Sequence, residues 1–292
     1  MIRKDKCMIA RPDPRYPDPK ILRNEVNSMC DSLMEILLES IPEDAIAGIY
    51  FKGSGHKEWE SPLDYVPEIS DVDIHLLFSD DQSVERYLGT TEQAIEIQKK
   101  LEKRYLEKVA EPYHFPRPQL MVLNLLLQEK DFVSSPKNTI SVLFGGEYPV
   151  SDCSNHERIM RIDCNHLLEE EEFILRFPLH IIDKPSKYLW QSLRNLVWHI
   201  SPIGARVLSI MGMAYEKAWS MNRTRIIAHL KEVGEQKLAQ DYTQFYLDCW
   251  KYFLSRYRDT DVGRSAIIAG IKALLRGVER AKLGVKSCNH TF

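Results

Sequence analysis

The spacing of hydrophobic residues in the first half of the chain predicts a mixture of helices and strands. Apolar residues recur every three or four positions over 21–37 and over 91–109, which is the spacing of an amphipathic helix. Residues 138–144 are expected to be extended. The order of the elements predicts a small α/β sheet domain that ends near residue 150. Three short apolar runs predict its buried strands, and they lie at 45–51, 71–78 and 116–127.

The second half of the chain has a different pattern. Beyond Gly145, nearly every segment over 156–284 has helical spacing and the connections are short, which predicts a helical bundle. We therefore expect an α+β fold with two domains. The first is a mixed-sheet domain over 1–150 that begins with an irregular arm at 1–19. The second is an all-α bundle over 151–292.

The stretch between the first two predicted strands carries the candidate chemistry. A strand ends at Gly53-Ser54-Gly55, where glycine lets the backbone approach a phosphate and the Ser54 hydroxyl adds a donor. Asp71 and Asp73 lie two apart on the next strand, so they face the same side. Two adjacent carboxylates are costly unless a cation neutralises them. Mg²⁺ or Mn²⁺ suits oxygen ligands, and Mg²⁺ usually binds together with substrate phosphates.

This combination resembles the DNA polymerase beta superfamily of nucleotidyltransferases, whose signature is Gly-Ser, a spacer and Asp-hydrophobic-Asp. Gly53, Ser54, Asp71 and Asp73 match it position by position. The run 70–78 is especially similar to the small-molecule branch, which includes aminoglycoside nucleotidyltransferases and in which a helical bundle follows the catalytic domain.

The resemblance implies an activity and a site in the cleft between the two domains. It implies Mg²⁺- or Mn²⁺-dependent transfer of a nucleoside monophosphate, with ATP as the expected donor, to a hydroxyl of a small-molecule acceptor such as an aminoglycoside-like compound. Asp71 and Asp73 would be the catalytic, metal-binding pair, and Gly53 and Ser54 would hold the β- and γ-phosphates.

Two features depart from the family pattern. The spacer between Ser54 and Asp71 is longer than usual, which predicts an extra loop at 56–70 beside the site. The family also places a third carboxylate on the following strand, whereas here Asn124 is the only polar residue in the apolar core of that predicted strand. An amide oxygen can ligate weakly but cannot act as a base. Acids elsewhere that could serve instead are Glu129, Asp131, Glu171, Glu172 and Asp183.

Cations around the first bundle helix are candidates for the triphosphate, although a solvated surface is their default role. They are Lys184, Lys187, Arg194 and Arg206. We assign Lys187 and Arg194 to nucleotide binding. Four tryptophans at helical core spacing are interpreted as core, and they are Trp190, Trp198, Trp219 and Trp250. His75 shares a face with Asp73. A contact with the nucleotide or with a carboxylate is open to it, but a hydrogen-bonded residue under the site is the favoured interpretation.

Other functions stay open. The missing third acid favours a catalytically silent nucleotide-binding or regulatory protein of the same fold. Arg194 and His199 fit the short arginine-to-histidine pattern of HEPN-like ribonucleases, but helical spacing places them only loosely on one side. A loosely zinc-like cluster falls in a partly helical stretch that does not suit it, and it comprises Cys153, His156, Cys164 and His166.

The composition limits the classes of partner that the protein is expected to bind. The 44% hydrophobic and 28% charged content is that of a globular protein, and the formal net charge of -3 gives no sign of a nucleic-acid acceptor. Nucleic acid or protein as acceptor is therefore possible but not favoured. No run is apolar enough for a signal peptide or a membrane span. The six scattered cysteines predict free thiols in the cytoplasm. The pattern does not determine the oligomeric state.

Overall fold

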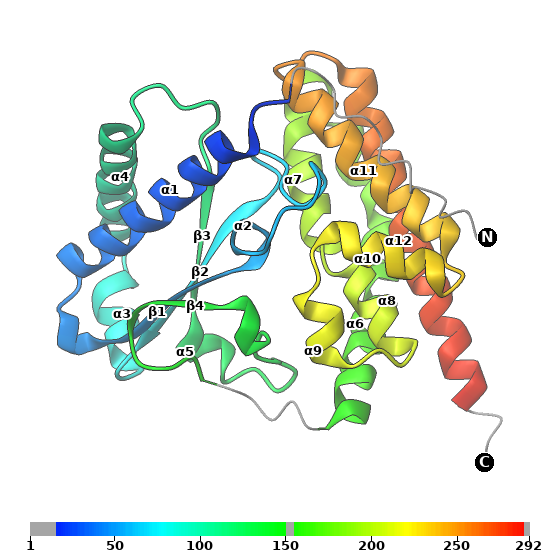
Figure 1. The fold of residues 1–292 in the computed structure, drawn as a ribbon, viewed down its shortest axis with the longest axis horizontal. Helices are drawn as coiled ribbons and strands as arrows, with labels where there is room; N and C mark the ends of the chain where they lie inside the picture. The colour runs from blue at the N-terminus through cyan, green and yellow to red at the C-terminus, as the bar shows by residue number, and fades with distance from the viewer. Residues whose placement is uncertain (1–15, 150–154, 289–292) are drawn as a thin grey trace, which may run out of the picture.

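The computed structural model describes residues 16–149 and 155–288, and these form an α+β fold with a four-stranded mixed sheet (Figure 1). The strand order is β3-β2-β1-β4, in which β1 is antiparallel to both of its neighbours and β2 is parallel to β3. The strands are β1 (Ile46–Lys52), β2 (Asp71–Phe78), β3 (Arg117–Val122) and β4 (Ser141–Gly145). The predicted mixed sheet is confirmed.

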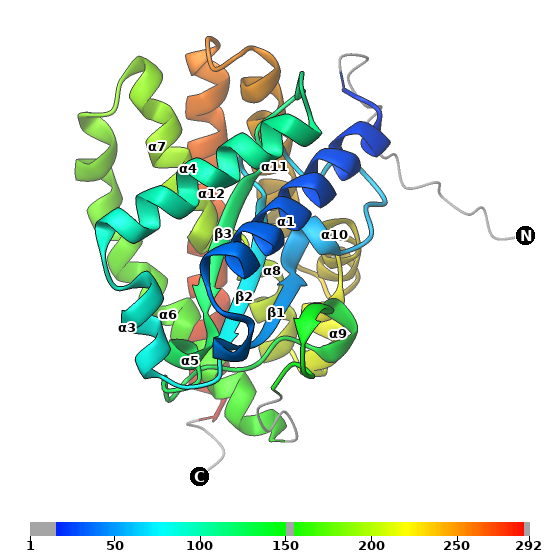
Figure 2. The same ribbon diagram turned by 90° about the vertical axis from the view of Figure 1, so that its left-hand side faces the viewer.

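Two long helices cover one face of this sheet, and both were predicted from their spacing. They are α1 (Pro19–Ser40) and α4 (Thr91–Lys108), which lie in front of the strands in Figure 2. Asp18 caps the start of α1, and a reciprocal capping box of Thr90 and Gln93 starts α4. The shorter helices of this half are α2 (Gly53–His56), α3 (Gln82–Leu88), α5 (Leu123–Leu126), η1 (Glu43–Ala45) and η2 (Lys137–Thr139).

The predicted strand at 116–127 is wrong in its second half, because β3 ends at Val122 and α5 follows. A short apolar run does not distinguish a strand from a buried helical turn. The Asn124 amide caps β2 just beyond the end of the β2–β3 ladder: its Oδ1 accepts from the Phe78 backbone N–H at 2.8 Å, and its Nδ2 donates to Phe78 O. Asn124 therefore lies at the far end of β2 from Asp71.

The C-terminal half is helical, as predicted, and lies behind the sheet in Figure 2. Its long final helix packs against α6, α7, α8 and α11. The helices are α6 (His156–Ile182), η3 (Ser186–Tyr188), α7 (Leu189–Ile200), α8 (Ile203–Ile210), α9 (Tyr215–Ser220), α10 (Arg223–Glu232), α11 (Gln236–Leu254) and α12 (Thr260–Cys288). The predicted domain boundary at 150 and most of the predicted arm at 1–19 lie outside the described residues.

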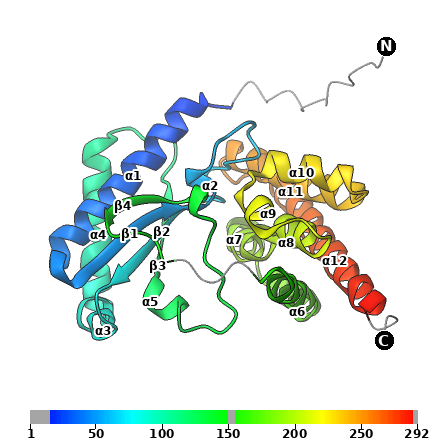
Figure 3. The ribbon, with the colours of Figure 1, turned by 60° about the horizontal axis from the view of Figure 1, so that its bottom comes forward.

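The predicted extra loop exists and docks the sheet on the helical half (Figure 3). Arg223 at the start of α10 is 6% exposed and donates to the carbonyl oxygens of Leu63 and Asp64 and to Ser70 Oγ, at 2.9–3.1 Å. In return, the Asp64 carboxylate accepts from the backbone N–H and the hydroxyl of Thr224, both at 2.8 Å. The loop thereby fixes where β2 begins.

One hydrophobic core runs through both halves. Val72 and Ile74 of β2 belong to the same cluster of buried side chains as Leu193 of α7 and Phe245 of α11, and all four are 0% exposed. The sheet and the bundle are therefore packed as one body. Across the described residues, no helix combines the length and apolar character that crossing a membrane requires.

Candidate functional site

Asp71 and Asp73 face the same side of β2, as the alternation predicted. Val72, Ile74 and Leu76 are completely buried on the other side. Asp73 pairs in register with Lys52, the last residue of β1. Gly53 follows with φ +78°, and a methyl group added to it would lie 1.7 Å from Asp73 Oδ2. The glycine turn therefore lies directly against the carboxylate, at a distance that only glycine permits.

The turn that contains Gly53 and Ser54 is held from behind by two side chains. The Arg23 guanidinium, from α1, donates to the carbonyl oxygens of Gly55 and Lys57. It also lies 3.6 Å from the ring centre of Trp59, whose indole N–H donates to Ser54 O at 2.8 Å. These contacts occupy carbonyl groups of the turn, so the short helix α2 is fixed in one orientation.

Gln119, and not Asn124, lies beside the two carboxylates. Gln119 pairs in register with Asp73 across the parallel β2–β3 ladder. When its amide nitrogen faces the acids, it donates to Asp71 Oδ2 at 3.0 Å and to Asp73 Oδ1 at 3.3 Å. The expectation that Asn124 occupies the position of the third acid is wrong, because the strand ends before it. β3 itself, from Arg117 to Val122, contains no acidic residue.

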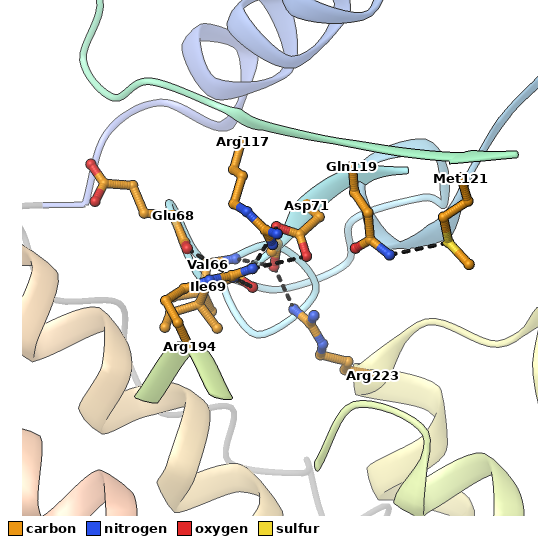
Figure 4. A network of polar contacts seen from close by, with 10 residues as sticks. Val66, Glu68, Ile69, Asp71, Arg117, Gln119, Met121, Arg194 and Arg223 are labelled. Carbon is orange, nitrogen blue, oxygen red and sulfur yellow. Dashed lines mark hydrogen bonds and ion pairs between the residues drawn. The ribbon is translucent and has the colours of Figure 1, made fainter. Parts of the chain in front are cut away.

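Two arginines contact Asp71 (Figure 4). Arg117 Nη1, from β3, lies 3.0 Å from Asp71 Oδ1. Arg194 Nη2, from α7, lies 3.0 and 3.2 Å from the two carboxylate oxygens of Asp71, while its Nη1 donates to the carbonyl oxygens of Glu68 and Ile69. Of the two predicted nucleotide-binding cations, Arg194 is thus at the site. Lys187 is not: it is exposed on η3, with its ammonium over the ring of Tyr188.

A cavity of about 260 Å³ opens between the sheet and the bundle at this point. Its cations face the two aspartates, with Lys52 and Lys57 from the sheet side and Arg223 from α10. Burial lowers the pKa of Lys57 to about 8, and its ammonium donates to the carbonyl oxygens of Trp219 and Met221. The lining therefore combines three cations with three acids, the third acid being Asp64.

Burial also changes the titration of the acids. It raises the pKa of Asp71 to about 6, although the nearby Arg117 and Arg223 oppose this shift. It raises the pKa of Asp73 to about 6 as well, where Lys52 opposes the shift and the neighbouring Asp71 adds to it. Pulling a carboxylate out of water disfavours its charged form, so both groups favour a cationic partner.

Trp198 is a correction to the sequence interpretation. It is 50% exposed, and it lines both the cavity and an adjoining hollow with Arg117 and Arg194. The guanidinium of Arg117 lies 5.7 Å from its ring centre. An indole at helical core spacing therefore faces the site, because α7 turns this side toward the sheet. Trp250, in contrast, is 1% exposed.

The acids considered as substitutes for the third carboxylate divide into two groups. Those of the helical half are paired with neighbours: Glu171 with Lys282, Glu172 with Arg176 and Asp183 with Lys184. Glu129 and Asp131, together with Asp163 and His75, line a second cavity of about 530 Å³ that shares Lys52 with the first. Asp163 was not anticipated from the sequence.

Two cationic candidates from the same region serve other roles. Lys184 pairs with Asp183 at the end of α6, and the largely buried Arg206 lies near Asp163 and Glu170. His75 is 1% exposed, and its Nδ1 bonds with Tyr148 Oη at 2.9 Å, in agreement with the interpretation of a hydrogen-bonded residue under the site.

The remaining two motifs do not form sites among the described residues. His199 bonds to Glu170 of α6 at 2.7 Å, whereas Arg194 bonds to Asp71, so the ribonuclease pair has separate partners. Cys153 of the zinc-like cluster lies outside the described residues. Within 16–149 and 155–288, no group of three or more histidine, cysteine, aspartate or glutamate residues is arranged to hold a metal ion.

Sequence reasoning missed Gln119 and Arg117. The available signal was their spacing, because residues two apart at the start of a strand share a face. That spacing alone does not show which strand lies beside β2.

No protein-family model, curated protein or solved structure matches the chain.

Proposed function

We propose that this protein is a metal-dependent nucleotidyltransferase that transfers a nucleoside monophosphate from ATP to a hydroxyl of a small-molecule acceptor. The observation that carries this proposal is the contact between Gly53 and Asp73, with Asp71 beside it. It brings backbone that a phosphate can approach against two carboxylates on one strand. Nucleotidyl transfer needs both parts within one site, because the metal and the phosphates bind as a unit.

The residues fit a divalent cation. When the Gln119 amide nitrogen faces the acids, it lies 3.0–3.3 Å from an oxygen of each aspartate, so both carboxylates converge on a single positively polarised atom. Oxygen ligands of this kind are those that Mg²⁺ and Mn²⁺ prefer. Asp71 and Asp73 would hold the ion, which would neutralise charge on the phosphates and polarise the α-phosphorus.

The chain's own side chains support the transfer by position and charge. Lys52 and Arg194 would neutralise the leaving pyrophosphate as the acceptor oxygen displaces it from the α-phosphorus. The second cavity adjoins the first, and its lining carries Glu129, Asp131 and Asp163 together with Lys52, Lys130 and Arg206. A small-molecule acceptor is supported by the net charge of -3, because a nucleic-acid acceptor would favour a basic protein.

A second candidate is a nucleotide-binding protein without catalysis. It is favoured by Gln119 in place of an acid, because an amide cannot take the proton of an attacking hydroxyl. The two arginines on Asp71 also compete with a metal for that carboxylate.

Pyrophosphate release and nucleotide binding, measured on the same variants, separate the two candidates. Wild type, Asp71→Asn and Asp73→Asn would be compared with Mg²⁺ or Mn²⁺ and ATP, against an aminoglycoside panel, bulk tRNA and no acceptor. Asp81→Asn, at the other end of β2, is the matched control. Release that needs both aspartates supports the enzyme, and binding without release supports the second candidate. If the wild type neither binds nucleotide nor releases pyrophosphate under any of these conditions, both are wrong.

A further inference from the structure

Three oxygen-bearing side chains meet at one point of the site. Gln119 extends from β3 over the face of the sheet that carries Asp71 and Asp73, and it lies between Asp71 and Met121 (Figure 4). One atom of its terminal amide is 3.0 Å from Asp71 Oδ2 and 3.3 Å from Asp73 Oδ1. The amide is therefore within reach of anything that bridges the two carboxylates.

Two orientations of the amide give its nitrogen an acceptor, but in the metal-free site only one of them also keeps the amide oxygen away from the carboxylates. In the first, the nitrogen faces the carboxylates and donates to both. In the second, a half-turn of the amide group exchanges the two atoms, and the nitrogen donates to Met121 Sδ at 3.2 Å while the oxygen faces the carboxylates. Figure 4 draws this second orientation. A terminal amide torsion is soft and nearly two-fold, so the two orientations interconvert readily.

The charge between the aspartates decides which orientation is favoured. Without a cation, the nitrogen-inward orientation is favoured, because an oxygen there would face two carboxylates without a proton. With a cation between the aspartates, the nitrogen would be repelled and the oxygen attracted. The Met121 sulfur then accepts the displaced N–H, so the amide keeps a partner.

We propose that Gln119 is a third, neutral metal ligand through its Oε1, and that its amide turns over when the metal binds. The inference rests on the proposed function, because it assumes that Asp71 and Asp73 hold the ion. Two carboxylates and an amide carry two negative charges where three carboxylates would carry three. The site therefore binds a free divalent ion weakly and gains affinity when nucleotide phosphates supply the missing negative charge.

Mn²⁺ binding to the full chain tests this without depending on activity. Free Mn²⁺ is followed by electron paramagnetic resonance, with and without a non-hydrolysable ATP analogue. Gln119→Leu keeps a similar volume and removes the ligand, and it weakens Mn²⁺ binding about tenfold. Gln119→Glu supplies the missing charge and tightens binding of the free ion about tenfold, a gain that misfolding cannot produce. Gln128→Leu, whose amide donates to Asp81 at the far end of the sheet, leaves the affinity unchanged.

Met121→Leu tests whether the Gln119 amide rotates by a half-turn when the metal binds. This variant keeps the ligand but removes the acceptor of the displaced N–H, so Mn²⁺ affinity falls by a factor of about three. In wild type, Mg²⁺ shifts the side-chain ¹⁵N resonance of Gln119, which is assigned by its absence from Gln119→Leu, and Asp71→Asn abolishes the shift.

The outcomes separate the inference from the proposed function. If Asp71→Asn abolishes Mn²⁺ binding while Gln119→Leu and Met121→Leu leave it unchanged, Gln119 is no ligand and the aspartate site stands. If Asp71→Asn and Asp73→Asn leave Mn²⁺ binding unchanged, the metal site is wrong and the proposed function fails with it.

Discussion

Arg194 of α7 donates to both carboxylate oxygens of Asp71 on β2, at 3.0 and 3.2 Å, and so connects the helical half of the molecule to the candidate metal site. Both side chains are largely buried, with 13% and 11% of their area exposed. Charge-assisted hydrogen bonds of this kind are stronger than neutral ones. The same guanidinium also holds the carbonyl oxygens of Glu68 and Ile69, directly before β2.

The arginines on Asp71 compete with a metal for the carboxylate. Arg117→Ala tests this, because the Arg117 side chain is 42% exposed and its guanidinium donates to Asp71 and not to the loop carbonyl oxygens that Arg194 holds. We expect free Mn²⁺ to bind about threefold more tightly, since one competing cation is gone, and the metal–ATP complex to bind more weakly. Calorimetry with and without ATP measures both. A parallel loss of both affinities would contradict the competition.

Gly53→Ala separates backbone strain from the contact with Asp73. Alanine is strained at φ +78°, and its methyl would also collide with Asp73 Oδ2. Gly212→Ala is the matched control, because it has φ +94° but nothing within 4 Å of the added methyl. Gly212→Ala should lose about 1 kcal/mol of unfolding free energy, and Gly53→Ala should lose more because of the added collision. Only Gly53→Ala should lose metal–ATP affinity, by at least about tenfold. Equal binding by the two variants would contradict a role for this contact.

The pKa of Asp73 predicts a pH-dependent stability in the metal-free protein. Burial raises the folded-state pKa to about 6 from an ordinary value of 3.8, so the folded state binds the proton more tightly than the unfolded chain. Ionised Asp73 therefore costs stability above about pH 6, and the cost disappears below about pH 4. Asp73→Asn should raise the unfolding free energy by about 1–3 kcal/mol at pH 7 and by little at pH 4. Urea denaturation at both values measures this, and a variant that is destabilised at pH 7 would contradict it.

Arg223 should dominate the docking of the 57–70 loop. It is buried and makes hydrogen bonds to Leu63, Asp64 and Ser70, so Arg223→Leu leaves buried acceptors unpaired and should cost about 3–5 kcal/mol. Arg225→Ala, two positions along the same helix but exposed, should change stability little. Chemical denaturation of both variants checks the difference. Similar stabilities would mean that the bundle docks without this contact.

Local patterns predicted the elements whose side chains pack directly against the core. The helices at 19–40 and 91–108 follow from their amphipathic spacing, and capping residues mark their starts. The strand at 71–78 follows from its alternation, which also placed Asp71 and Asp73 on one face. Such features depend on residues a few positions apart, so a single sequence contains them.

Only the tertiary structure decided what lies beside those aspartates. Strand register places Gln119 opposite Asp73, the docking of α7 brings Arg194 to Asp71, and the docking of α10 brings Arg223 to the cavity beside it. In the tertiary structure Trp198 is also half exposed, although local spacing had assigned it to the core. The sequence by itself determined the two acids and the glycine turn, because strand alternation and glycine geometry are local. Their neighbours depend on contacts between residues far apart in the chain, which periodicity does not encode.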